Sequence, residues 1–242
     1  MMINIVHWGL IAAAAVLGAA TQGAIGFAGN LVTVPALMVL DPRLIPAPLL
    51  IAGAVRSGAI VARERSGLDR KLLAAVILGQ VFGSGLGLVM LSIVSRNNSG
   101  VLFGSLLLVG VGASVVGWKP VPNNSLAFTF GVISGAMGTS AAIGGPVLAL
   151  LYQRASGKTI RSSMSALILV GSCISISALW MSGRISLYDL EASALLLPAQ
   201  VVGLIIAVKL IKVIDRDLIR KIVLFLVALS GLASIVQALV IK

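Results

Sequence analysis

Two glycine-rich stretches interrupt the apolar sequence, and their polar side chains could bind a small anion. The first, TQGAIGFAGN, covers residues 21–30, and an approximate copy, SGAMGTSA, covers residues 134–141. Within a membrane, a chain leaves the helical conformation only where protein or a water-filled cavity covers its backbone. Breaks at corresponding positions of two halves are typical of the binding site of a transporter.

A short apolar segment follows each break, and we expect each segment to be a helix that begins there. These segments are residues 31–40 and 141–152. The first N–H groups of a helix carry a partial positive charge, so two such helix starts would bind an anion without any charged side chain. The expected substrate-binding residues of the two breaks are Gln22, Gly23, Gly26, Gly29, Asn30, Gly138, Thr139, Ser140, Gly144 and Gly145.

The same glycines have a second interpretation, because small residues also let membrane helices pack closely. The duplication of the break, the short segments after it and the polar neighbours favour a binding site over packing alone.

Three further polar residues inside apolar segments complete the candidate site. Gln80 and Gln200 lie 120 residues apart at corresponding positions. A buried amide in lipid needs a partner, which is either a ligand or another helix. Arg56 is the one clear charge in mid-span, where ionisable residues are functional by default. Because Arg56 is only seven residues from the basic loop at Arg63, its side chain could instead reach the membrane surface.

The composition is that of a polytopic membrane protein. Of the 242 residues, 59% are hydrophobic and 10% are charged, against roughly 25% charged residues in soluble domains. The net charge of +11 lies in short loops between apolar segments, which follows the positive-inside rule, so we expect no nucleic-acid partner. All seven acidic residues lie in or beside loops, which disfavours a cation or proton pathway and favours an anionic substrate.

The sequence contains no motif of a familiar enzyme. There is no Walker A, G-x-S-x-G or H-E-x-x-H pattern, so we expect no enzyme activity and no catalytic residue. The single cysteine, Cys173, excludes an internal disulfide and a cysteine-rich metal site. We therefore expect neither a metal nor a cofactor.

The alternation of apolar segments and polar turns predicts an all-α protein with broken or short helices at the glycine-rich motifs. A linker at residues 119–124 divides an N-terminal repeat, residues 1–118, from a C-terminal repeat, residues 125–242. Each repeat has about five membrane elements. They are residues 4–20, 31–40, 44–62, 72–94 and 99–118, and then 125–138, 141–152, 162–181, 190–210 and 218–240.

Matched residues at constant spacing support this division, and the loop charges orient the two halves. Gly23 and Gly26 match Gly135 and Gly138 at a spacing of 112, and QVFG at 80–83 matches QVVG at a spacing of 120. Five elements in each half put thirteen basic residues on one side of the membrane and four on the other. Four spans in each half would instead put seven basic residues on one side and six on the other. The first arrangement obeys the positive-inside rule, and an odd number of elements inverts the second half. We therefore predict a cytoplasmic linker and two external termini.

The two breaks together resemble those of the sulfite exporter TauE/SafE family of membrane permeases. The resemblance lies in GAIGFAG at 23–29 with VPAL at 34–37, and in GAMG at 135–138 with GGP at 144–146, and it covers nearly the whole chain. It implies transport of sulfite, sulfonates or related small organosulfur anions. The first motif departs from the family at Ala28 and Asn30, where glycines are common, and the next span departs at Pro46 and Pro48.

The sequence thus predicts a secondary transporter of small anions in the plasma (inner) membrane of a bacterium, working by alternating access. One alternative is a passive anion channel, and another is a non-transporting membrane scaffold or assembly factor. The expected partners are a small anionic substrate and the lipid bilayer. A homo-oligomer is compatible with the sequence, and no coupling ion is assigned.

Overall fold

The computed structural model describes residues 5–93, 99–115, 121–152 and 155–211, and the single residues 225, 228 and 232. Over these residues the protein is all-helical, with nine α-helices and no strand. Apart from those three single residues, the predicted span at 218–240 lies outside the described ranges, as do the turn at 95–98 and the first residues of the predicted linker. The helices are α1 (Ile5–Ile25), α2 (Gly29–Leu40), α3 (Ala47–Arg63), α4 (Leu73–Ile93), α5 (Ser99–Val115), α6 (Asn124–Ala141), α7 (Gly145–Ala149), α8 (Gly157–Met181) and α9 (Leu187–Leu210).

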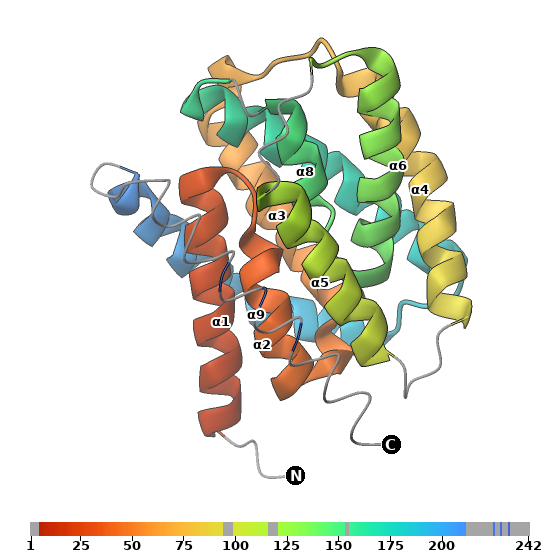
Figure 1. Ribbon diagram of the computed structural model, residues 1–242. Helices are drawn as coiled ribbons and strands as arrows, with labels where there is room; N and C mark the ends of the chain where they lie inside the picture. The colour runs from red at the N-terminus through yellow and green to blue at the C-terminus, as the bar shows by residue number, and fades with distance from the viewer. Residues whose placement is uncertain are drawn as a thin grey trace.

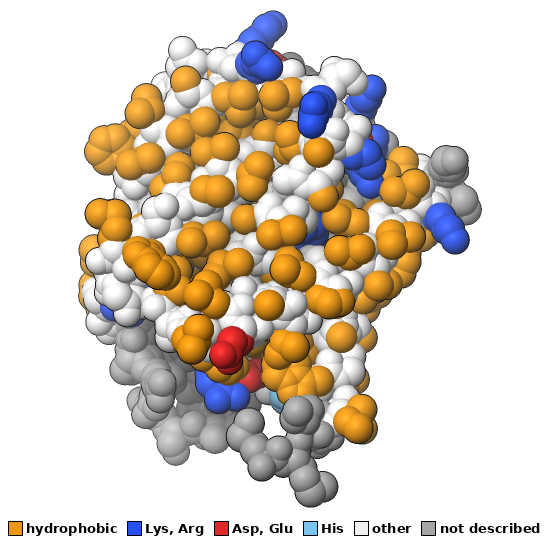
Figure 2. All heavy atoms as spheres, turned by 180° about the vertical axis from the view of Figure 1, so that it is seen from behind, with side chains coloured by type: hydrophobic (Ala, Val, Ile, Leu, Met, Phe, Trp, Pro, Cys, Tyr) orange, Lys and Arg blue, Asp and Glu red, His pale blue; other side chains and the backbone are white. Residues whose placement is uncertain are grey.

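Four of these helices, α1, α4, α8 and α9, are long and apolar enough to cross a membrane. Large apolar side chains are exposed along them, as expected for a surface that faces lipid. Figure 2 shows hydrophobic side chains covering the middle of the molecule, with Lys and Arg gathered mainly at one end. The protein is an integral membrane protein.

The first predicted break is confirmed, and it folds the chain back on itself. Helix α1 ends at Ile25 and α2 begins at Gly29, and α2 returns toward the end of the molecule at which the chain starts (Figure 1). Gly26 has a φ angle of 103°, and an added Cβ there would lie 2.7 Å from Cα of Arg161. Glycine is therefore required both by the backbone conformation and by the contact with α8.

The second break lies later than predicted. Gly135 and Gly138 are inside α6, which continues to Ala141, and the chain leaves the helix at residues 142–144. The reason is packing: a Cβ on Gly135 would lie 2.5 Å from the backbone oxygen of Gln80 in α4. Gly79 and Gly83 make equally close approaches from α4 to α6, so this pair of helices uses small residues at its interface.

The segment after the second break is also shorter than the predicted residues 141–152. Helix α7 has five residues and continues into a short 3-10 turn at Leu150–Tyr152. Helix α8 then begins at Gly157, several residues before the predicted span at 162, because the Ser156 hydroxyl accepts a hydrogen bond from the amide of Thr159.

The central helices α3 and α8 are joined by a buried ion pair. Nε of Arg161 lies 2.7 Å from Oε1 of Glu64, and the two residues are only 8% and 7% exposed. Glu64 follows the end of α3, as its predicted loop position requires, whereas Arg161, also predicted to lie in a loop, belongs to the first turns of α8 and is buried against the end of α3. Helix α3 also packs on α9, and α9 packs on α1, so these three helices form one packed group.

Candidate functional site

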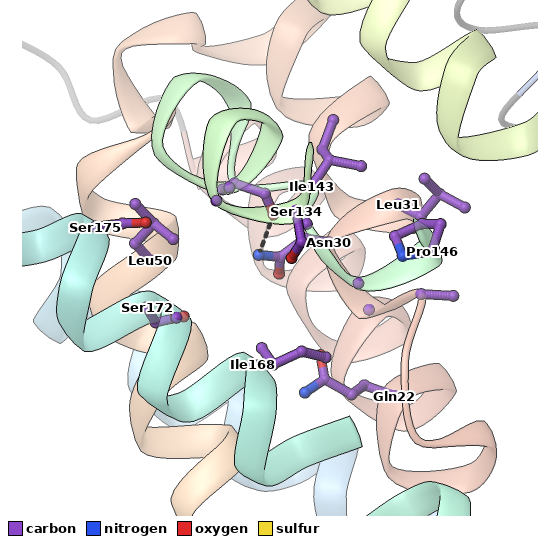
Figure 3. A pocket seen from close by; sticks show the side chains of 18 of the residues that line it. Gln22, Asn30, Leu31, Leu50, Ser134, Ile143, Pro146, Ile168, Ser172 and Ser175 are labelled. Atoms are coloured by element: carbon purple, nitrogen blue, oxygen red, sulfur yellow. Dashed lines mark hydrogen bonds between the residues drawn. The ribbon is translucent and has the colours of Figure 1, made fainter. Parts of the chain in front are cut away.

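A small cavity lies where the two breaks meet. Its volume is about 40 Å³, which is room for roughly three to four water-sized atoms. Figure 3 shows Gln22 and Asn30 on one side of this cavity and Ser172 and Ser175 of α8 on the other. The cavity is lined by Gln22, Ala28, Gly29, Asn30, Leu31, Leu50, Gln80, Ser134, Gly135, Gly138, Ala142, Ile143, Gly144, Gly145, Pro146, Ile168, Gly171, Ser172 and Ser175.

The two breaks contact each other directly at the wall of the cavity. Nδ2 of Asn30 donates a hydrogen bond of 2.8 Å to the backbone oxygen of Ala142, drawn as a dashed line in Figure 3. Ala28 and Ala142 both adopt left-handed backbone conformations, with φ angles of 66° and 60°. Such a conformation costs about 1–2 kcal/mol in a residue other than glycine, and strain of this kind concentrates at functional sites.

Behind this wall lies a buried arginine held by three side-chain amides. Arg56 is 1% exposed, and its Nη1 donates to Oε1 of Gln200 at 2.6 Å. Its Nη2 donates to Oε1 of Gln22 at 2.8 Å and to Oδ1 of Asn30 at 2.7 Å. Nε2 of Gln22 in turn donates to the hydroxyl of Ser57 at 2.9 Å. Snorkelling to the surface, the alternative considered for Arg56, is therefore excluded.

No carboxylate balances the charge of Arg56 among the described residues. Asp41 pairs with Arg43, whose hydrogen bonds hold the pKa of that carboxyl below its usual value. Glu64 pairs with Arg161, and the remaining described carboxylates lie in loops or beside helix ends. Burying an unpaired charge is costly, so a ligand that supplied the missing negative charge would be strongly favoured.

The amide groups carry the positive potential of Arg56 toward the cavity. Because the oxygens of Gln22 and Asn30 face the guanidinium, the positive ends of both amide dipoles face away from it. The first amides of α2, those of Gly29, Asn30 and Leu31, precede the first backbone bond of that helix, from Val32 to Ala28. Free amides at a helix start attract anions, and these residues line the cavity.

Most of the predicted site residues come together here. Seven of them line the cavity, namely Gln22, Gly29, Asn30, Gln80, Gly138, Gly144 and Gly145. Two more, Arg56 and Gln200, form the layer behind it.

Four predicted site residues face elsewhere. Gly23 packs against Ala207 of α9, and Gly26 packs against the backbone of Arg161. The hydroxyl of Thr139 bonds to those of Ser84 and Ser175, and the hydroxyl of Ser140 bonds within its own helix to the oxygen of Ala136. The expected second helix start is present at Gly145, but α7 has only five residues, which is too short to give the partial charge of a longer helix.

Sequence reasoning missed the serines that face the breaks. Ser134, Ser172 and Ser175 line the cavity, and Ser57 holds Gln22. The available signal was the spacing of three residues between Ser172 and Ser175, which puts both hydroxyls on one face of an apolar helix. No group of three His, Cys, Asp or Glu side chains that could hold a metal occurs within the described ranges.

Comparison with known proteins gives one family. The family model named Sulfite exporter TauE/SafE matches residues 10–234. No curated protein and no solved structure matches the chain.

The structure predicts how Arg56 contributes to stability. Arg56→Met leaves the oxygens of Gln22, Asn30 and Gln200 without their donor, which we expect to cost about 1–3 kcal/mol for each buried acceptor that stays unpaired. Arg56→Lys keeps the charge, but an ammonium group cannot reproduce the forked hydrogen-bond geometry of a guanidinium. We therefore expect Arg56→Lys to lower the stability by less than Arg56→Met does. The measurement is the midpoint of thermal unfolding in detergent.

The matched control is Arg184→Met, which removes an exposed arginine from a loop. Equal midpoints for Arg56→Met and Arg184→Met would show that the three amides do not depend on the guanidinium.

Proposed function

Because the chain belongs to the sulfite exporter TauE/SafE family, whose members are membrane transporters of sulfur anions and not enzymes, we propose that it moves small sulfur oxyanions across the membrane by alternating access. The observation that carries this proposal is the charge of Arg56, which no described carboxylate balances and which lies one layer behind a cavity. Sulfite is the smallest substrate of the class, and sulfonates are larger members of it.

The magnitude of the attraction supports an anion as the ligand. At a separation of about 5 Å and an effective dielectric constant of about 20, the guanidinium attracts a monoanion by roughly 3 kcal/mol. That is about a hundredfold in affinity, which exceeds the roughly 1 kcal/mol of a neutral hydrogen bond. The charge therefore decides the sign of the ligand, and the amides decide its orientation.

The size of the cavity supports a compact oxyanion. A volume of about 40 Å³ matches the few heavy atoms of sulfite, whereas a longer sulfonate requires the walls to separate. A small cavity is also better suited to a carrier than to a passive channel, in which a continuous pore would connect the two sides.

The course of the chain supports two inverted repeats, with residues 1–118 and 125–242 as the halves and residues 119–124 as the linker. Helix α1 starts at one end of the molecule, and α2 returns to that same end. Helix α6 starts beside the linker, and α7 leads back to the start of α8 at the basic end. The two hairpins thus enter from opposite ends, and inverted repeats with a site at their interface are a common transporter design.

The basic end of the site is closed by a contact within the first half, in which Nη2 of Arg63 donates to the oxygen of Gly23 at 3.3 Å, and by two contacts between the halves. The Glu64–Arg161 pair joins α3 to α8, and Gly26 rests on the backbone of Arg161. In the alternating-access mechanism that we propose, these contacts separate when the cavity opens toward the cytoplasm. We assign the protein to the plasma (inner) membrane of a bacterium, with both termini outside.

The central role of Arg56 predicts the effect of Gln22→Glu. The new carboxylate would pair with Nη2 of Arg56 in place of the amide oxygen, and Ser57 would donate its hydroxyl proton to it. The fold should be retained, while affinity for sulfite should fall by at least about tenfold because the internal charge replaces the ligand. The measurement is sulfite binding by calorimetry, with unfolding midpoints on the same samples.

The control is Asn124→Asp, which adds a negative charge at an exposed position. Unchanged sulfite affinity in Gln22→Glu would contradict an anion site at Arg56. If sulfite and other sulfur oxyanions do not bind the wild-type protein at all, a scaffold role becomes the better account.

The inverted arrangement predicts opposite sidedness for two loops. In a Cys173→Ala background, Arg43→Cys should react with an impermeant thiol reagent in intact cells, because Arg43 lies between α2 and α3 at the external end. Lys158→Cys, at the exposed start of α8, should react only after the membrane is permeabilised. Labelling of both cysteines from the same side would contradict the inversion.

A further inference from the structure

Gln80 brings a hydrogen-bond acceptor without a partner to a site that otherwise presents donors. It lies in the middle of α4, is 2% exposed and lines the cavity. Its Nε2 donates to the backbone oxygen of Leu167 at 3.2 Å, and since a carbonyl can only accept, this bond fixes which end of the amide is nitrogen. The remaining atom, Oε1, is buried and has no hydrogen-bond partner among the residues that the structure describes. Buried acceptors are nearly always paired, so we expect this oxygen to accept a hydrogen bond from a donor in the cavity.

The corresponding glutamine of the other half indicates what kind of group fills such a position. Oε1 of Gln200, 120 residues later, accepts an N–H of the Arg56 guanidinium at 2.6 Å. Facing Gln80, by contrast, α8 has Gly171, and a Cβ at that position would lie 2.5 Å from Nε2 of Gln80. The acceptor of Gln200 is therefore paired with a donor from the other half of the chain, whereas the acceptor of Gln80 is left beside the cavity.

We propose that Gln80 selects oxyanions that carry a proton: Oε1 of Gln80 accepts the O–H of the ligand, while its deprotonated oxygens face Asn30, Gln22 and the charge of Arg56. This inference rests on the proposed function, and it names the form of the substrate that binds. For sulfite, the bound species is hydrogen sulfite, a monoanion with one hydroxyl in its O-protonated form. A fully deprotonated oxyanion would bring an oxygen lone pair against the amide oxygen, which is repulsive.

The charge of the ligand agrees with this assignment. Arg56 supplies one positive charge, and its described neighbours Gln22, Asn30, Ser57 and Gln200 are neutral. A monoanion therefore neutralises the site, whereas a dianion would leave one negative charge buried in an apolar surrounding.

The protein itself contributes little to titrate near Gln80. Helices α4 and α6 contain no ionisable residue, and the cation across the cavity is Arg56, which stays protonated. Helix α8, which also packs on α4, carries Lys158 and Arg161 in its first turns and Cys173 in mid-helix. Cys173 lies in a separate apolar groove with Val81, away from the cavity. A pH dependence of binding would thus report protonation of the ligand.

The experiment compares sulfite with methanesulfonate, a monoanion of similar shape that has no O–H at any pH of interest. Binding to the purified wild-type protein is measured by calorimetry one pH unit below and about one unit above the second pKa of sulfurous acid. The apparent affinity for total sulfite should fall about tenfold across this range, as the fraction of hydrogen sulfite does. The affinity for methanesulfonate should stay constant.

The variant Gln80→Met tests the residue itself, because methionine has a similar length and no amide oxygen. We expect its affinity for hydrogen sulfite to fall about tenfold, or roughly 1.4 kcal/mol, while its affinity for methanesulfonate is equal to or higher than that of wild type. Ser92→Ala, at the exposed end of α4, is the control and should leave both affinities unchanged.

The possible results separate this inference from the proposed function. If neither anion binds wild type at either pH, the anion site itself fails. If both bind and the affinity for sulfite does not depend on pH, or if Gln80→Met weakens both anions equally, the anion site stands and the role of Gln80 is overturned. The wild-type comparison needs no variant, so selection of the protonated oxyanion is tested even if Gln80→Met does not fold.

Discussion

The structure depends on one buried positive charge. Arg56 lies in the apolar centre of the molecule, and among the described residues it has amide oxygens for partners and no carboxylate. Those oxygens come from α1, α2 and α9, so solvating this one side chain fixes where three helices meet. Within the described part of the chain this solvation is incomplete, since Nε of Arg56 has no hydrogen-bond partner there and no described carboxylate neutralises the charge. A site of this kind gains most from a ligand that is small and negative.

The two breaks form the cavity that lies in front of that charge. A continuous helix through residues 26–28 would carry α1 past the centre, whereas the left-handed backbone at Ala28 turns the chain and exposes the first amides of α2. Ala142 does the same at the end of α6, and Asn30 ties the two turns together with one hydrogen bond while its oxygen faces Arg56. Asn30 therefore connects the charge, both breaks and the cavity wall. Both breaks therefore contribute to the wall of this one cavity.

The sequence predicts the fold well where a membrane leaves few choices. Backbone groups in lipid must bond within helices, so apolar segments and their ends are readable, and the break at 21–30 is marked by glycine beside polar residues. The second break was misplaced because glycine has two roles: Gly135 serves the contact with α4, while Ala142, which the pattern did not single out, turns the chain. The residue type of Arg56 indicated a function. Only its three hydrogen-bond partners in the structure show that the side chain is buried and does not reach the membrane surface. Ser172 and Ser175 are common residues in apolar helices, and only the fold brings them to the breaks.

The central claim is that an oxyanion binds between the two breaks, in front of Arg56. Its most direct test is a crystal structure of the protein with selenite, the heavier analogue of sulfite, measured at the selenium absorption edge with a selenium-free protein. The account predicts one strong anomalous peak inside the cavity, within hydrogen-bonding distance of Asn30 or Gln22 and on the side of the cavity facing Gln80. An anomalous peak only at the basic loops, or an unoccupied cavity at selenite concentrations that saturate binding in solution, would contradict it.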